Sequence, residues 1–386
     1  KCVAHFLYNI NIGMFCMNDP HYNPFNQQIR GVNLGGWMVL EPWITPSLFY
    51  QFLGKQKQTT AMDTYTFCQV LGPDEGNRQL RIHWDTWVTE EYISELASLN
   101  INSLRLPLGD WMFTPYGPYE GCTEGSLEKV DWLLQIAAKY NLKVLLDLHG
   151  VIASQNGFDN SGLAKEIHIE KINNIIHFDH WNYRSADWIG NYNLTTKSYD
   201  NINYNNIHFT LEVIQQVLNR YKNRKSFWGL EPINEPWEYT PLKELKYFYK
   251  NVYDIFLNEQ LFNKVLILHD SFRPDKWKTA YFLESNGKPK IKIYLDTHQY
   301  MAWGKPIPFN DYILGAKRWK QPNSAFDIIV GEFSLATDNC IMWLNGFMDN
   351  YPGFPLQKCF IEDCPFKDKY LSQIRNVING PFGTGY

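Results

Sequence analysis

Short apolar runs alternate with amphipathic stretches along most of this 386-residue chain, and this alternation limits the possible folds more than any other feature. The run Val144-Leu145-Leu146 is continuously apolar, as in a parallel sheet that is covered on both faces. The pattern predicts seven strands: Ile29–Trp37, Ile101–Gly109, Leu142–His149, Phe227–Asn234, Lys264–Asp270, Ile291–Tyr300 and Asp327–Phe333.

The stretches between these strands predict the helices that cover the sheet. They are His83–Leu99, Ser126–Tyr140, Asn206–Lys222, Leu242–Asn258, Trp277–Leu283, Asp311–Trp319 and Lys367–Val377. Strands and helices that alternate in this way predict an α/β fold, the (β/α)8 or TIM barrel. We expect residues 1–28 to form an N-terminal extension and residues 29–386 to form one barrel domain with a long loop at 150–203.

A closed barrel of this type needs an eighth strand. The sequence ends at Tyr386, directly after the last predicted helix, where that strand should begin. We therefore expect strand eight to lie beyond Tyr386. Without it, the first and seventh strands would have unpaired edges.

Composition excludes several classes of function. Charged residues make up 20% of the chain and the formal net charge is −4, so the sequence has no basic footprint for nucleic acid. We expect no membrane span, because no apolar run approaches 18 residues.

The seven cysteines have no metal-ligand spacing, and their pairing stays open, as does the oligomeric state. The sequon Asn193-Leu194-Thr195 is a glycan acceptor if the protein is secreted.

Two glutamates carry the chemical interpretation. Glu235 lies in Gly-Leu-Glu-Pro-Ile-Asn-Glu-Pro-Trp (229–237), and Glu332 lies in Ile-Ile-Val-Gly-Glu-Phe-Ser (328–334). Each follows an apolar run, at the position where α/β barrels carry catalytic groups. Two carboxylates that face each other across a glycosidic bond suffice to hydrolyse it. Asn-Glu-Pro alone is also a common turn, so the pairing of the two motifs favours a glycoside hydrolase.

A metal-dependent hydrolase is the alternative. Asp147 with His149, Asp296 with His298, and the pair His269-Asp270 have residue types that bind metals. The first predicted strand, however, ends in Asn-Leu-Gly-Gly and offers no ligand. We therefore predict no metal and no cofactor.

Longer motifs in the chain resemble the fungal exo-β-1,3-glucanases of glycoside hydrolase family 5. The resemblance covers about residues 28–380 in order. The motifs are Arg-Gly-Val-Asn-Leu-Gly-Gly-Trp (30–37), Leu-Glu-Pro-Trp (40–43), Thr-Pro-Ser-Leu-Phe (45–49), Asp-Leu-His-Gly (147–150), Ser-Gln-Asn-Gly-Phe-Asp-Asn-Ser-Gly (154–162), Asn-Glu-Pro, Gly-Glu-Phe-Ser and Trp-Leu-Asn-Gly (343–346).

The resemblance implies a retaining mechanism with assigned residues. Glu235 matches the general acid/base and Glu332 matches the nucleophile. Arg105 and Tyr300 are placed to keep the nucleophile ionised, and Asn234 matches the residue that holds the sugar 2-hydroxyl. The residues expected to hold other hydroxyls of the terminal glucose are Glu41, His149, Asp159, Asn160 and His298. Phe158 and Trp303 fall where the family places an aromatic clamp on the next sugar.

The chain departs from the family pattern at three places. Val151-Ile152-Ala153 replaces the usual Ala-Pro-Gly, the segment 163–203 is longer, and the strand-eight tryptophan that floors the glucose subsite is expected beyond Tyr386. The resemblance implies an exo-acting enzyme, secreted or wall-associated, with β-glucan or an oligosaccharide as its substrate. An endo-acting or transglycosylating relative, or a glucan-binding wall protein that has lost turnover, are the alternatives.

Overall fold

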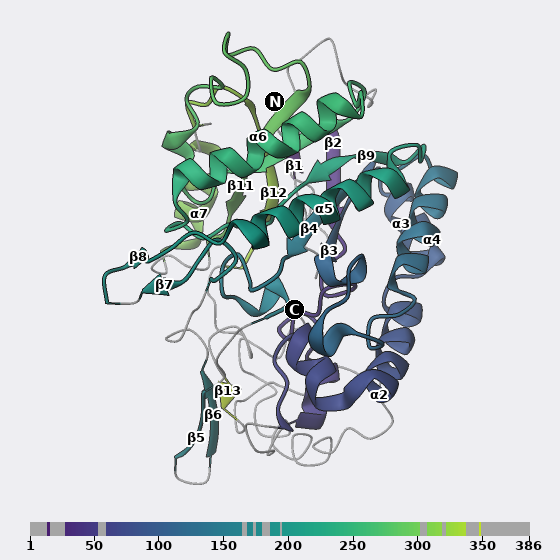
Figure 1. Ribbon diagram of the computed structural model, residues 1–386. Coiled ribbons are helices and arrows are strands. Elements are labelled where there is room, and N and C mark those ends of the chain that lie inside the picture. The colour runs from purple at the N-terminus through teal and green to yellow at the C-terminus, as the bar shows by residue number, and fades with distance from the viewer. Residues whose placement is uncertain are drawn as a thin grey trace.

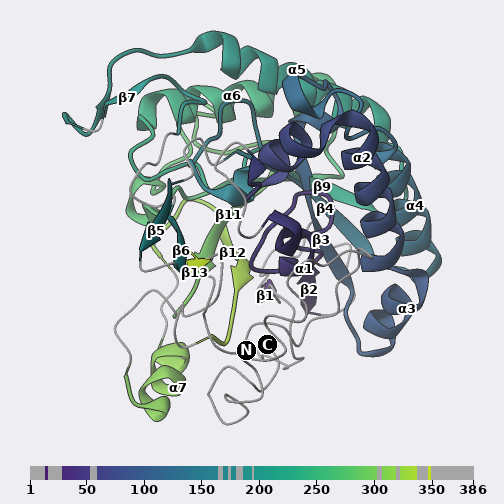
Figure 2. The same cartoon turned by 90° about the horizontal axis from the view of Figure 1, so that it is seen from below.

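A parallel β-barrel forms the centre of the protein (Figures 1 and 2). The computed structural model describes residues 14–15, 28–52, 59–163, 168–172, 175–179, 186–193, 195–301, 307–318, 322–336 and 347–348. Within these ranges the parallel strands are β2 (Ile29–Asn33), β3 (Ser103–Gly109), β4 (Lys143–Gly150), β9 (Phe227–Glu231), β10 (Val265–His269), β11 (Lys292–Gln299) and β12 (Asp327–Phe333). Each corresponds to a predicted strand, so the predicted barrel fold is confirmed.

The eighth place in the barrel is taken by β1 (Met14–Phe15). This strand pairs antiparallel with β12, where Met14 lies opposite Val330, and with β2, where Met14 lies opposite Arg30. The first and seventh parallel strands are therefore paired here, and not left with the unpaired edges expected of an open barrel. The strand comes from the segment that the sequence predicts to be an N-terminal extension.

Helices cover the outside of the barrel, with α3 to α6 around one side of it in Figure 2. They are α1 (Pro46–Phe49), α2 (Thr64–Trp87), α3 (Glu90–Ser98), α4 (Ser126–Lys139), α5 (Tyr204–Tyr221), α6 (Leu242–Asn258) and α7 (Phe309–Arg318). Single 3-10 turns are η1 (Tyr50–Phe52), η3 (Asp110–Met112), η4 (Gly117–Tyr119), η5 (Asp159–Ser161) and η7 (Pro274–Lys276). Among the described residues, no helix is both long enough and apolar enough to cross a bilayer.

Short strands lie outside the barrel, most of them in the long loop predicted at 150–203. They are β5 (His168–Ile172), β6 (Ile175–Asp179), β7 (Tyr192–Asn193), β8 (Ser198–Tyr199) and β13 (Phe347–Met348). The first two form a hairpin that β13 extends to three strands, and β7 with β8 forms a second hairpin. The loop therefore has secondary structure of its own.

Two helix predictions were wrong. The stretch predicted as His83–Leu99 is divided between α2 and α3, and α2 begins far earlier, at Thr64. Asp63 caps α2 by accepting a hydrogen bond from the Thr66 amide at 2.7 Å, and Gly72, with a φ of 73°, only kinks the helix. The side chain of Thr89 caps α3 and so separates the two.

The segment predicted as the helix Trp277–Leu283 contains no helix in the structure. Its first residue is held in a loop from both sides. The indole Nε1 of Trp277 donates to the Asp270 carbonyl at 2.8 Å, and the backbone carbonyl of Trp277 accepts from the Ala325 amide at 2.9 Å. The predicted helix Lys367–Val377 lies outside the described residues.

The interior of the barrel is apolar at one level and charged at another. The apolar level consists of Ile29, Leu145, Trp228, Val265, Ile267, Tyr294 and Ile329. Because side chains alternate along a strand, the residue two places on in a strand points to the same side but lies closer to its carboxyl end. Asp147 follows Leu145 in this way and Asp296 follows Tyr294, so the charged groups lie above the apolar level.

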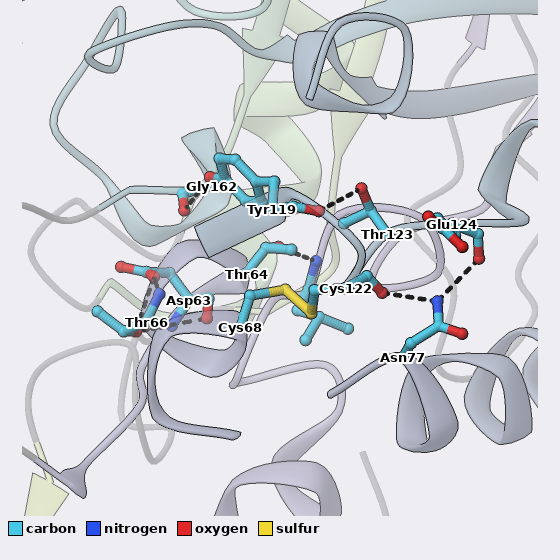
Figure 3. Close-up of a disulfide and its surroundings, with 11 residues drawn as sticks. Asp63, Thr64, Thr66, Cys68, Asn77, Tyr119, Cys122, Thr123, Glu124 and Gly162 are labelled. Carbon is cyan, nitrogen blue, oxygen red and sulfur yellow. Dashed lines mark hydrogen bonds between the residues drawn. A yellow bond between two sulfur atoms is a disulfide. The ribbon is translucent and has the colours of Figure 1, made fainter. Parts of the chain in front are cut away.

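A disulfide joins α2 to the loop that follows β3 (Figure 3). It links Cys68 to Cys122, a pairing that the sequence left open. The side-chain amide of Asn77 in α2 donates to the carbonyls of Cys122 and Glu124, both at 2.8 Å. These contacts fix the loop after β3 against the helix.

Candidate active site

Glu235 and Glu332 lie at the carboxyl ends of β9 and β12 and meet at one imidazole. The Nδ1 atom of His298 lies 2.6 Å from Glu235 Oε1 and 3.4 Å from Glu332 Oε2. Both carboxylates therefore lie beside one imidazole nitrogen. The expected spacing of about 5–5.5 Å between the carboxyl groups stays a prediction.

Arg105, in β3, holds the polar groups of the barrel interior together. Its guanidinium donates to Glu332 Oε1 at 2.8 Å, to Glu231 Oε2 at 2.9 Å and to Asn234 Oδ1 at 2.8 Å. It also lies 3.1 Å from Asp147 Oδ2. Arginine suits this position because its planar fork offers five donors and keeps its charge. The side chain is buried, so these charged bonds are little screened by water.

Glu332 is held ionised by its neighbours. Burial raises the pKa of its carboxyl, but the charges of His298 and Arg105 outweigh burial and lower the pKa to about 2. The hydroxyl of Tyr300 also donates to Glu332 Oε2 at 2.7 Å. The expected contacts of Arg105 and Tyr300 with this carboxylate are therefore present in the structure. An ionised carboxylate is what a glycosidase nucleophile requires.

Glu235 is held in a backbone conformation that non-glycine residues seldom adopt. Its φ is 42°, in the left-handed region, although Pro236 follows it and residues before proline favour extended backbone. Such strain persists only where surrounding contacts fix it, and it concentrates at functional sites. Besides His298, the side-chain amide of Asn160 contacts Glu235, with Nδ2 3.3 Å from Oε2.

The run 154–162 is attached directly to the site. Gln155 Nε2 donates to the carbonyl of His149 at 2.7 Å and to that of Asn234 at 2.9 Å. One side chain thus ties the ends of β4 and β9 together. The ring of His149 is oriented by Asp147, with 2.6 Å between Nδ1 and Oδ2, and its Nε2 lies 3.4 Å from Asn234 Nδ2.

The other residues expected to hold sugar hydroxyls are buried around this centre. Glu41 Oε1 accepts from the Gly36 amide at 3.0 Å, and burial, together with the charges of Glu332 and Glu235, raises its pKa to about 7. Burial also raises the pKa of Asp159 well above its ordinary value. Phe158, which directly precedes Asp159, is half-buried. Trp303, the expected partner of Phe158 in the aromatic clamp, lies outside the described residues.

Asp296 and His269 also belong to this network, although the sequence motifs assign them no role in a glycosidase. Asp296 Oδ1 accepts from the Gly331 amide at 2.5 Å, and its Oδ2 lies 3.6 Å from His298 Nε2. The His269 ring packs edge-on against that of His298, with 4.5 Å between centroids. The strand pattern indicates this role for Asp296, because Asp296 and His298 are two residues apart in β11 and therefore point to the same side of the strand. Glu231 pairs with Arg105, as a buried carboxylate inside a strand would suggest.

Two groups of described residues bring possible metal ligands within 4.8 Å of one another. They are Glu235, His269 and His298, and Glu231, Asp296 and His298. Burial lowers the pKa of His298, but Glu332, Asp296 and Glu235 raise it well above its ordinary value. A protonated imidazole donates hydrogen bonds from both nitrogens and cannot ligate a metal. The donor set therefore fits a hydrogen-bonded network better than a metal site.

Comparisons with known proteins give one consistent result. The family model described as cellulase (glycosyl hydrolase family 5) matches residues 68–340. A glucan 1,3-beta-glucosidase of Blumeria graminis is 34% identical over 83% of this chain and 68% of its own length. A glucan 1,3-beta-glucosidase of Schwanniomyces occidentalis is 31% identical over 92% of this chain and 79% of its own length.

A solved structure is similar over most of the chain. The crystal structure of a rutinosidase from Aspergillus niger superimposes with a TM-score of 0.60 over 80% of each chain. The two sequences are 22% identical, so this likeness supports the barrel fold alone.

Proposed function

We propose a function from one established premise: the chain belongs to glycosyl hydrolase family 5. The protein is a retaining glucan 1,3-β-glucosidase that removes glucose from the non-reducing end of β-1,3-glucan. The observation that carries this proposal is the position of His298 Nδ1, which lies 2.6 Å from Glu235 and 3.4 Å from Glu332. Two carboxylates therefore lie beside one imidazole nitrogen, and a retaining mechanism requires two carboxyl groups that are close together.

In the first step, Glu332 attacks the anomeric carbon of the terminal glucose while Glu235 protonates the departing glycosidic oxygen. The bond between the sugars breaks, and a covalent glucosyl–enzyme ester forms at Glu332. The ion pair with Arg105 and the hydrogen bond from Tyr300 keep the attacking carboxylate deprotonated. They also orient its two oxygens, since each oxygen accepts one of these bonds.

In the second step, Glu235, now ionised, removes a proton from a water molecule. That water attacks the anomeric carbon, the ester to Glu332 breaks, and glucose leaves with its original β-configuration. Asn234 contributes by holding the sugar 2-hydroxyl through its side-chain Nδ2. Its Oδ1 is already occupied by Arg105 Nη2 at 2.8 Å, which fixes the direction of the amide.

Exo action requires a pocket that is closed at one end. The run 154–162 supports this assignment because Asn160 reaches Glu235 and Gln155 holds the adjoining backbone. We assign Glu41, His149, Asp159, Asn160 and His298 to the hydroxyls of the bound glucose, and Phe158 with Trp303 to the next sugar.

Secretion, at the cell wall or beyond it, is part of the proposal. The disulfide between Cys68 and Cys122 supports it, because such bonds persist in oxidising compartments. Asn193, in the sequon, is half-buried on the β7–β8 hairpin, and its side-chain amide donates to the Asp200 carboxylate at 3.2 Å.

The products formed from laminarin test the proposal. We expect glucose as the only early product, released as the β-anomer and detected by proton NMR before mutarotation. A ladder of oligosaccharides would indicate endo action, and early α-glucose would indicate inversion. Glu332→Ala should abolish turnover while laminarin affinity stays within about an order of magnitude, because the substitution removes a transition-state interaction. A wild-type protein that binds laminarin without hydrolysing it would support the glucan-binding alternative.

A further inference from the structure

Three aromatic side chains that the mechanism does not use lie close together, two on the loop that contains Glu235 and one on the β7–β8 hairpin. We call Tyr192, Trp237 and Tyr239 the aromatic platform. The Tyr192 ring lies 4.5 Å from that of Trp237 and 6.0 Å from that of Tyr239, centroid to centroid. The Trp237 and Tyr239 centroids are 5.1 Å apart. Trp237 is buried, Tyr192 is half-buried and Tyr239 is 45% exposed.

The platform is fixed to the backbone of the site. Trp237 and Tyr239 follow Glu235 by two and four residues. An extended chain spans at most about 3.5 Å per residue, so Tyr239 lies within about 14 Å of Glu235. The Trp237 amide donates to the Gln155 carbonyl at 3.2 Å, and Ser271 Oγ donates to the Trp237 carbonyl at 2.9 Å. These hydrogen bonds fix the backbone of Trp237 next to the catalytic loop.

The third ring comes from the β7–β8 hairpin, which projects outward past the start of α5 in Figure 1. Tyr192 lies opposite Tyr199 in this hairpin, and the Tyr199 hydroxyl donates to the Ala186 carbonyl at 2.9 Å. Gly190, just before the hairpin, has a φ of 155°, and a Cβ there would lie 1.9 Å from the Asn201 carbonyl oxygen. Only glycine permits this close approach, which positions Tyr192 against the other two rings.

The chemistry of the platform fits a polysaccharide. Aromatic faces provide large apolar contact areas, and tyrosine hydroxyls add polar edges. Sugar rings offer the matching apolar C–H faces with hydroxyls around them. The exposed carboxylate of Glu238 lies between Trp237 and Tyr239 in sequence and supplies an acceptor for such hydroxyls.

We propose that the aromatic platform binds the β-glucan chain on the leaving-group side of the scissile bond, a few sugars beyond the pocket. This inference rests on the proposed function and adds to it a site that favours polymeric over short substrates. The hairpin that carries Tyr192 lies in the segment 163–203, outside the motifs that carry the resemblance to the family.

Kinetics on long and short substrates test the platform. Tyr239→Ala and Tyr192→Ala should each raise the KM for laminarin about threefold to tenfold, from the usual strength of aromatic contacts. Both variants should hydrolyse an aryl β-glucoside, which cannot reach the platform, within about twofold of the wild type. Tyr239→Phe should retain the wild-type KM for laminarin because it retains the ring. Tyr247→Ala, at a tyrosine of α6 that is 42% exposed, is the matched control.

Two results would overturn the platform: a laminarin KM equal to that of the Tyr247→Ala control, or equal losses on laminarin and the aryl glucoside. Failure of the proposed function looks different, because the wild type itself would then leave laminarin intact. In that case, affinity electrophoresis through a laminarin-containing gel tests whether the platform binds laminarin. Weaker retardation of Tyr239→Ala than of Tyr247→Ala would support the platform, and equal retardation would refute it.

Discussion

Arg105 Nη1 and Glu332 Oε1 form a buried ion pair at 2.8 Å. The same guanidinium contacts Glu231 and Asp147, so a single cation serves three carboxylates. A buried carboxylate that has lost its cation raises the free energy of the folded state, and such a carboxyl group usually becomes protonated. The reactive state of Glu332 thus depends on a residue in another strand.

Arg105→Lys should therefore damage both activity and stability. A lysine ammonium is a compact point charge and cannot reproduce the forked contacts with Glu332, Glu231 and Asn234. We expect kcat to fall by about 100-fold or more, and the free energy of unfolding to fall by about 3–5 kcal/mol, as for other broken buried pairs. Kinetics on an aryl glucoside and urea unfolding measure the two effects. A variant with wild-type values in both would contradict the role of Arg105.

Azide should distinguish the roles of the two glutamates. In Glu332→Ala, azide can occupy the place of the nucleophile and attack an aryl β-glucoside that has a good leaving group, giving the α-glucosyl azide. In Glu235→Ala, the ester at Glu332 still forms, and azide then attacks it to give the β-glucosyl azide. NMR of the products identifies each anomer. If both variants gave the same anomer, the assignment of Glu235 and Glu332 would have to be abandoned.

Asp110 should make the protein less stable as the pH rises from about 4 to 7. Burial raises the pKa of Asp110 from its ordinary 3.8 to about 7, despite hydrogen bonds from Tyr116 and the Ile152 amide. Below pH 3.8 the carboxyl is protonated in both states, so its contribution to stability is fully present. As the pH rises toward 7, the unfolded chain ionises first, and about 4 kcal/mol is lost.

Asp110→Asn isolates this effect, since Glu41 and Asp270 also have raised pKa values and shift stability in the same direction. Urea unfolding measures the free energy of unfolding at pH 4 and pH 7. Relative to the wild type, the free energy of unfolding of the variant should be higher at pH 7 than at pH 4 by a few kcal/mol. Asp275→Asn, at an exposed aspartate, provides the control. A difference between Asp110→Asn and wild type that is the same at both pH values would refute the prediction.

Chelation should leave activity unchanged. His298 belongs to both groups of possible metal ligands, and its neighbours favour its protonated form. We expect the same initial rate of laminarin hydrolysis before and after dialysis against EDTA. A loss of activity that Zn²⁺ or Mn²⁺ restores would instead favour the metal-dependent alternative.

The parts of the fold that the sequence predicted are those set by local pattern. The run Asp327–Phe333 is apolar and β-branched, and its predicted bounds equal those of β12. The amphipathic helix Leu242–Asn258 likewise has its predicted bounds. Because barrel strands end on one face, the position of His149, His298 and Tyr300 at or near predicted strand ends was enough to bring them together.

Other features depend on contacts between distant segments. Seven cysteines allow many pairings, and only the approach of the 110–125 loop to α2 selects Cys68 with Cys122. Pairing of Met14–Phe15 with β2 and β12 depends on backbone edges that become available only when the barrel forms. The left-handed backbone of Glu235 is equally invisible in sequence, since Asn-Glu-Pro favours an extended residue before proline.

The expected aromatic clamp leads to a prediction for Phe158. Its backbone amide donates to Asn156 Oδ1 at 2.9 Å, and its carbonyl accepts from Ser161 Oγ at 2.6 Å, so these hydrogen bonds hold the turn through the backbone of Phe158. Phe158→Ala should therefore remove an apolar face and leave the loop in place. An exo-enzyme must grip the departing sugar yet release it, and an aromatic face provides contact that tolerates sliding.

We expect Phe158→Ala to lower kcat/KM for laminaritriose by about tenfold and to affect an aryl β-glucoside much less, since an activated leaving group needs less positioning. Phe262→Ala, at a phenylalanine that is 53% exposed in the turn between α6 and β10, is the control. Equal losses on both substrates would mean that Phe158 acts through the structure of the loop. An effect confined to laminaritriose would place its ring at the sugar that follows the cleaved bond.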